Sequence, residues 1–182
     1  MNPRDNFRKK MMMNPNSYQT FQNNDLYGYN YQYVRNTLQI NQGPRVNAND
    51  SIGAPIFSEV GFLAGMNETD WSWCPIVADF DNDGNKDIIF ICQKESNGGN
   101  VFENKHYYFY YENNGDGTFT LNTSAFPVDG VPFKGFGLPN YVVIDYNHDG
   151  YLDFYNMNSS MNAFFMWDKT IGKFKKTDRY GL

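Results

Sequence analysis

The sequence has few of the residues that enzymes commonly use for catalysis. Its 182 residues include only two cysteines and two histidines, and neither pair has the spacing of a zinc site or of a Cys/His or Ser/His/Asp catalytic group. No phosphate-binding loop is present, and no pair of glutamates stands out as the acid pair of a glycosidase. We therefore expect a protein that is not an enzyme.

Basic residues and long apolar runs are also scarce. Lys and Arg number 15 against 20 Asp and Glu, which gives a net charge of −5 and argues against a broad basic face for nucleic acid phosphates. No apolar stretch approaches the roughly 20 residues of a membrane-spanning helix. We expect neither a nucleic-acid partner nor a membrane span.

Aromatic residues, by contrast, are abundant. They make up 18% of the chain, with 16 Phe and 14 Tyr, and 16 Gly accompany them. Aromatic side chains favour strands, and glycine favours turns. The composition therefore predicts an all-β protein.

Two nine-residue segments share the pattern D-x-[DN]-x-D-G-x-x-D. They occupy residues 79–87 and 145–153, which are 66 residues apart. Apolar runs precede and follow each segment, as is typical of two strands joined by a loop. We call these segments the first and second acidic loops and expect each to connect a β-hairpin.

A second similarity lies downstream of each loop. Residues 109–119 align with 164–174, and a split counterpart occurs early, at 38–43 and 55–57. The repeat unit is then strand, acidic loop, strand, strand, tight turn, strand, which is typical of a propeller blade. We predict an all-β fold of tandem four-stranded antiparallel blades of a partial β-propeller with calcium-binding hairpin loops; two unrelated hairpins in a sandwich are the alternative. The predicted organisation is an amino-terminal arm at 1–34, a half blade and connection at 35–72, and blades at 73–137 and 138–182.

The acidic loops predict two calcium sites. Carboxylates this close together repel one another unless a cation lies between them, and ligands that are all oxygen favour Ca²⁺ before Mg²⁺. An EF-hand is excluded because position 12 is not Glu and the flanks read as strands; acidic turns without metal are the alternative. The predicted ligands are Asp79, Asp81, Asp83, the carbonyl of Asn85 and Asp87 in the first loop, and Asp145, Asn147, Asp149, the carbonyl of Tyr151 and Asp153 in the second.

These loops resemble the calcium-binding motifs of FG-GAP/VCBS repeats, the blades of integrin-α-type propellers. Phe136-Gly137-Leu138-Pro139 is close to the segment that gives the family its name, and residues 71–75 occupy the same place in the first unit. Segments 35–41, 57–65 and 69–73 are also similar to secreted Bacteroidota proteins related to cartilage acidic protein. The resemblance implies calcium-binding blades in a class with adhesive, lectin and structural members. Two and a half blades are fewer than the four to eight of a closed propeller.

The two cysteines predict a disulfide. If Asp79 opposes Asp87 across the hairpin, the numbers of opposed residues sum to 166, as those of Cys74 and Cys92 do. Directly opposed residues have Cα atoms about 4.5–5.5 Å apart, within disulfide range; two buried thiols are the alternative. A disulfide and a calcium requirement would both favour an extracellular or cell-surface location.

Two further patterns concern the surface. The tyrosines at 27, 29, 31 and 33 alternate, which would place four rings on one face of a strand, either for sugar or partner binding or for ordinary packing. Candidate glycosylation sites of the type Asn-x-Ser/Thr occur at Asn49, Asn67, Asn122 and Asn158.

Together these features predict an extracellular, calcium-stabilised structural or adhesive protein. Because two and a half blades leave open sheet edges, we expect self-association into an oligomer or filament. The alternatives are a carbohydrate- or protein-binding module and a fragment of a larger cell-surface propeller.

Overall fold

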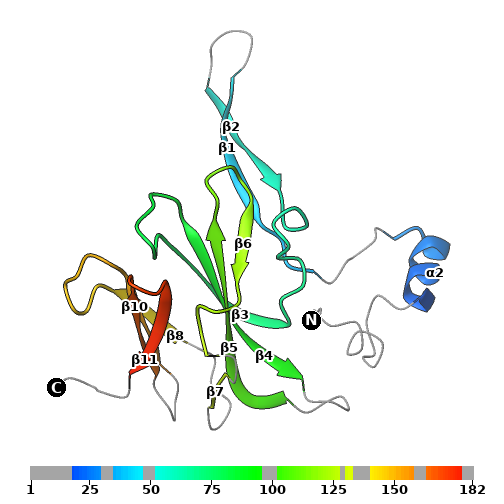
Figure 1. Ribbon diagram of the computed structural model, residues 1–182. Helices are drawn as coiled ribbons and strands as arrows, with labels where there is room; N and C mark the ends of the chain where they lie inside the picture. The colour runs from blue at the N-terminus through cyan, green and yellow to red at the C-terminus, as the bar shows by residue number, and fades with distance from the viewer. Residues whose placement is uncertain are drawn as a thin grey trace.

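The computed structural model describes most of the chain, and the description that follows concerns residues 18–29, 35–46, 52–95, 102–127, 130–132, 140–157 and 163–177. These segments are mostly β, and their strands form antiparallel sheets (Figure 1). The predicted antiparallel four-stranded units are therefore confirmed. In the described part of the chain, no helix has the length and apolar character needed to span a membrane.

The first sheet surrounds the first acidic loop. It consists of β3 (Trp71–Ala78), β4 (Asp87–Glu95), β5 (Phe102–Asn113) and β6 (Phe119–Asn122) in consecutive order, and β7 (Val131–Pro132) pairs with the start of β5. Each strand joins its neighbour as an antiparallel hairpin.

The second sheet repeats this arrangement around the second acidic loop. It is a four-stranded antiparallel meander of β8 (Asn140–Ile144), β9 (Asp153–Met157), β10 (Ala163–Asp168) and β11 (Lys173–Thr177). Its last hairpin is one residue longer than the corresponding hairpin of the first sheet: Trp167 pairs with Phe174, whereas the equivalent Asn113 pairs with Phe119.

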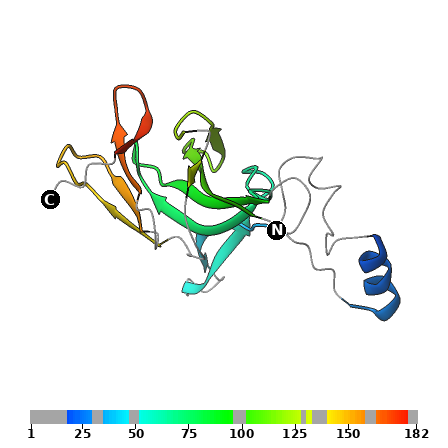
Figure 2. The same cartoon turned by 90° about the horizontal axis from the view of Figure 1, so that it is seen from below.

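The main core lies between these two sheets (Figure 2). Aromatic rings dominate it: Phe154 stacks on Phe165 with ring centroids 4.7 Å apart, and Phe126 stacks on Phe174 at 4.6 Å. Aliphatic side chains of β3 and β4 complete the core from the first sheet. The aromatic residues that dominate the composition thus hold one sheet against the other.

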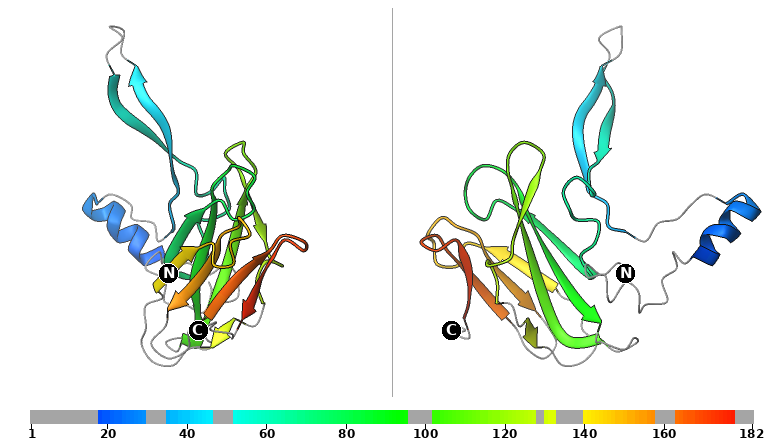
Figure 3. Two further views of the ribbon diagram at one scale, coloured as in Figure 1. Left: turned by 90° about the vertical axis from the view of Figure 1, so that its left-hand side faces the viewer. Right: turned by 45° about the vertical axis from the view of Figure 1, so that its right-hand side comes forward.

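A separate hairpin precedes the first sheet. Its strands, β1 (Gln39–Val46) and β2 (Ile52–Glu59), pair with each other in a two-stranded sheet. The connection after β2 contributes Ala64 and Met66 to a second, smaller core on the other face of the first sheet. In Figure 1 and the right-hand view of Figure 3, the hairpin projects away from the two larger sheets.

The predicted strand of alternating tyrosines is wrong where the structure describes it. Helix α2 (Tyr18–Tyr27) includes the first of these tyrosines, and Gly28, with a φ of +66°, ends the helix. The backbone N–H of Tyr29 donates to Asn24 O at 2.9 Å, which closes the helix end. A tyrosine at every second position therefore does not mark a continuous strand face here; Tyr31 and Tyr33 lie outside the described residues.

The predicted disulfide is also wrong, because Cys74 and Cys92 are both thiols. A β-bulge between Ser72 and Cys74 shifts the register, so Cys74 lies opposite Ile91 and Cys92 lies opposite Ser72. Directly opposed residues share a face and neighbours along a strand alternate, so the two sulfur atoms lie on opposite faces of the sheet. The Ser72 hydroxyl lies 3.4 Å from Cys92 Sγ.

Candidate metal centre

Both acidic loops bend through two residues with left-handed backbone conformation. Gly84 and Gly150, at position 6, have φ of +92° and +88°, which glycine adopts at little cost. Position 4 is also left-handed, with φ of +61° at Asn82 and +57° at His148. The sequence predicts the bend at position 6, whereas the one at position 4 is not apparent from it.

The two loops share one hydrogen-bond pattern. The position-1 carboxylate accepts from the backbone N–H groups of positions 5 and 6, the position-3 side chain accepts from position 5, and the position-5 carboxylate accepts from position 7. These distances are 2.7–3.2 Å in the first loop and 2.9–3.1 Å in the second. The polar side chains at positions 1, 3 and 5 thus wrap both loops around their own backbone.

The aspartate at position 9 anchors the first loop to the sheet. Asp87 is fully buried. Its Oδ2 accepts from the Phe80 backbone N–H at 3.1 Å and from the Tyr110 hydroxyl at 2.7 Å, and its Oδ1 accepts from the Asn113 backbone N–H at 2.9 Å. Three donors from the loop and from β5 therefore compensate for the burial of this carboxylate.

The second loop repeats this anchor with one donor fewer. Asp153 is also fully buried, and its oxygens accept from the backbone N–H groups of Tyr146 at 3.1 Å and Trp167 at 2.9 Å. Phe164 occupies the position that Tyr110 has in the first sheet. Tyr110 and Phe164 each pair with the third residue of the strand that follows the acidic loop. Phenylalanine has no hydroxyl to donate.

Three carboxylates of the first loop come together. Single oxygen atoms of Asp79, Asp81 and Asp87 lie within 4.8 Å of one another, so these side chains could hold a metal ion. Burial, followed by the charge of Asp87, raises the pKa of Asp81 to about 6; burial also raises the pKa of Asp87, and its hydrogen bonds oppose this. A cation between the three carboxylates would remove the repulsion, and an all-oxygen donor set suits a hard divalent ion.

Asp83, the fourth predicted carboxylate ligand of the first loop, lies outside this cluster. Asp83 is exposed, and its carboxylate accepts from both the backbone N–H and the side-chain amide of Asn85, at 2.7 and 3.0 Å. These hydrogen bonds lower the pKa of Asp83. Asp83 is therefore directed toward Asn85 in the structure.

The second loop brings fewer carboxylates together than the first. Among the described residues, no group of three acidic side chains meets there, because Asn147 replaces an aspartate at position 3. The Asn147 amide donates to Asp149 Oδ2 at 3.0 Å. Asp145 and Asp153 keep their positions in the shared hydrogen-bond pattern, while Tyr151 donates its backbone N–H to Asp149.

The two loops lie side by side next to a cleft between the sheets. The Asn82 amide donates to the Gly150 carbonyl at 2.6 Å. The cleft has a volume of about 390 Å³ and combines carboxylates, amides and aromatic rings. The Lys169 ammonium lies 5.3 Å from the centre of the Tyr151 ring. The lining residues are Asp81, Glu112, Asn122, Ser124, Tyr151, Trp167, Lys169, Ile171 and Gly172.

Two of the four candidate glycosylation sites lie in the described segments. Asn67 is half-buried. The Asn122 amide nitrogen donates to Glu112 Oε1 at 2.6 Å, and its oxygen accepts from Ser124. Asn49 and Asn158 lie outside the described residues.

Comparisons with protein-family models, with curated protein sequences and with solved structures give no match to this chain.

Proposed function

We propose that this chain is a calcium-stabilised structural or adhesive repeat protein, built from blades of the FG-GAP/VCBS type, that works outside the cell or at its surface and self-associates. The observation that carries the proposal is the recurrence of one loop, with one hydrogen-bond pattern, in two stacked four-stranded sheets. We expect a loop that recurs in both repeats to have a structural role, which is to hold its hairpin rigid.

The gathered carboxylates support calcium as the ion. Asp79, Asp81 and Asp87 offer three carboxylate oxygens from one loop, and Ca²⁺ takes 6–8 oxygen ligands at 2.3–2.6 Å. When bound, the ion supplies positive charge that offsets the repulsion among the carboxylates. We propose a second Ca²⁺ in the second loop, held by Asp145, Asp153 and the amide oxygen of Asn147.

The stoichiometry of calcium binding tests this part of the proposal. Isothermal titration of the metal-free protein with Ca²⁺ should give two ions per chain, and one after either Asp79→Asn or Asp145→Asn. Asp116→Asn is the matched control, because Asp116 is an exposed aspartate in the tight turn outside both acidic loops; it should leave two sites. No heat of binding up to about 10 mM Ca²⁺, ten times the weak limit for extracellular calcium modules, would overturn the proposal.

Light scattering tests the self-association. The wild-type protein in Ca²⁺ should have a mass above the 21.1 kDa of one chain. A stable, folded species of exactly one chain over the micromolar range would contradict this part of the proposal and leave the calcium sites standing.

The cleft beside the loops supports a second candidate function, carbohydrate binding. It brings Asp81 and Glu112 together with the Tyr151 ring and the Lys169 ammonium, and hydroxyl-rich ligands use both polar groups and aromatic faces. Binding to a glycan array that is lost in Glu112→Gln would favour this function, while an array without any signal would count against it.

A further inference from the structure

The two larger sheets stack with unlike faces in contact. In the first sheet, Ile76, Ile89 and Tyr110 form a cross-strand row that faces the core between the sheets. The second sheet faces that core with the opposite face, which carries Phe154 and Phe165. One face of each repeat therefore serves as the contact for the next repeat.

The second sheet has the same contact face, but its side chains are exposed. We define this open face by Val142, Ile144, Tyr146 and Met157. Their exposed fractions are 44, 46, 46 and 39%. At the equivalent positions of the first sheet, 66 residues earlier, Ile76, Phe80 and Ile91 are 2, 0 and 0% exposed and Ala78 packs against the core. The open face thus has apolar residues at positions that a following sheet covers in the first repeat.

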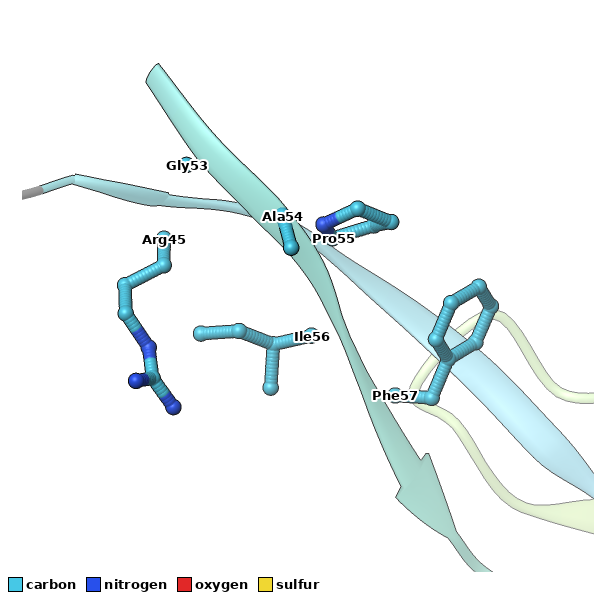
Figure 4. Close-up of a pocket in the computed structure, with 6 residues that line it drawn as sticks. All are labelled: Arg45, Gly53, Ala54, Pro55, Ile56 and Phe57. Atoms are coloured by element: carbon cyan, nitrogen blue, oxygen red, sulfur yellow. The ribbon is translucent and has the colours of Figure 1, made fainter. Parts of the chain in front are cut away.

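The β1–β2 hairpin also has an apolar side whose side chains are exposed. Val46 pairs with Ile52 and Pro44 pairs with Pro55, which places Phe57, two residues beyond Pro55, on the same face as Val46 and Ile52. Val46, Ile52 and Phe57 are 70, 83 and 54% exposed. A shallow hollow of about 530 Å³ lies along this hairpin, and Figure 4 shows Ile56 and Phe57 on opposite sides of β2. A two-stranded hairpin is marginally stable in water by itself, so an apolar partner would stabilise it.

The order of the elements along the chain makes the two surfaces complementary. The segment after β2 packs on one face of the first sheet, and the second sheet packs on the other, so the hairpin and the open face belong to opposite ends of the stack (Figure 1). If the hairpin of a second copy packed on the open face of the first copy, the sheets of the two chains would form one continuous stack. Such a head-to-tail contact uses two different surfaces and can repeat from copy to copy.

We infer that the open face of the second sheet binds the β1–β2 hairpin of a second copy of this chain. The inference rests on the proposed self-association and identifies its interface. A charged residue in either apolar surface should block the contact, because it would be desolvated without a partner.

Sedimentation velocity of the full chain in Ca²⁺ tests the interface with two variants and a control. Val142→Asp alters the open face, and Phe57→Asp alters the hairpin. Val77→Asp is the control, because Val77 is a valine even more exposed than Val142, at 57% against 44%, on β3, the strand equivalent to β8, but on the other face of the sheet. Val142→Asp and Phe57→Asp should each sediment as a monomer, and Val77→Asp should assemble like the wild type.

Mixing the two blocked variants gives the sharpest result. Val142→Asp retains an intact hairpin and Phe57→Asp retains an intact open face, so the mixture should form a one-to-one dimer and nothing larger. Met157→Glu serves as a second open-face variant if Val142→Asp does not melt as a folded protein.

The outcomes separate this inference from the proposed function. If the wild type assembles and the open-face variants assemble equally well, the interface is wrong and self-association stands. If Val142→Asp is monomeric while Phe57→Asp assembles normally, the hairpin is not the occupant. A monomeric wild type in Ca²⁺ would overturn both the self-association and the interface.

Discussion

Removal of one hydroxyl group tests how the first acidic loop is anchored. Tyr110→Phe deletes the 2.7 Å hydrogen bond to Asp87 Oδ2 and leaves the ring in place, so no cavity is created. Hydrogen bonds to charged groups contribute about 1.5–3 kcal/mol, and Asp87 is fully buried, so water does not replace the lost donor. We expect the free energy of unfolding to fall by about 2 kcal/mol. For a chain of this size that loss lowers the melting temperature by about 4–8 °C.

The matched control is the neighbouring tyrosine of the same strand. The Tyr111 hydroxyl donates to the neutral carbonyl of Gly65 at 3.3 Å, so Tyr111→Phe should cost about 0.5–1 kcal/mol. Urea unfolding of both variants, in EDTA and again in Ca²⁺, measures the difference. If Tyr110→Phe costs no more than Tyr111→Phe, the hydroxyl does not stabilise a buried carboxylate and the description of the anchor is wrong.

Three further changes test other parts of the structure. Phe164→Tyr places a hydroxyl where Asp153 has one donor fewer than Asp87, and should raise the free energy of unfolding by about 1 kcal/mol in urea titrations; a loss would show that the two anchors are not equivalent. Gly84→Ala puts a side chain at a φ of +92° and should cost about 1 kcal/mol by the same assay, whereas an unchanged midpoint would contradict the left-handed conformation. Burial lowers the pKa of His106 to about 4, so below pH 6.5 the unfolded chain takes up a proton that the folded chain does not. The free energy of unfolding of the wild type should therefore fall between pH 6.5 and pH 4.5 by about 2 kcal/mol more than that of His106→Gln. If the free energies of the two proteins changed in parallel with pH, the lowered pKa of His106 would be contradicted.

Local patterns in the sequence are enough to predict the acidic loops and their strands. The carboxylates, the glycine at position 6 and the flanking apolar runs all lie within about 15 residues, where spacing alone sets the geometry. The contact between Tyr110 and Asp87 depends instead on the register of β4 and β5. The sequence alignment of the two repeats is off by one residue at this point, because the second hairpin has one residue more between Phe164 and Phe174 than the first has between Tyr110 and Phe119. This difference hides the equivalence of Tyr110 and Phe164.

Strand register and a helix end account for the two predictions that are wrong. The disulfide prediction assumes an unbroken register, and the bulge before Cys74 places the two sulfur atoms on opposite faces. The tyrosine strand fails because Gly28 ends a helix within the alternating pattern. Neither a bulge nor this helix is visible in a pattern of residue types. Asp83 stays a predicted ligand, whose carboxylate in the structure accepts from the Asn85 amide.

The melting temperature in the presence of calcium tests the central claim most directly. The wild type is melted in EDTA, in Ca²⁺ at about 100 times the dissociation constant, and in Mg²⁺ at the same concentration. Each occupied site should add about 2.7 kcal/mol. For a chain of this size that corresponds to about 5–11 °C per site, so the two sites together should raise the melting temperature by about 11–22 °C in Ca²⁺. The rise should be smaller in Mg²⁺ and in Asp79→Asn. The same melting temperature in EDTA and in Ca²⁺ would contradict the claim that these loops are structural calcium sites.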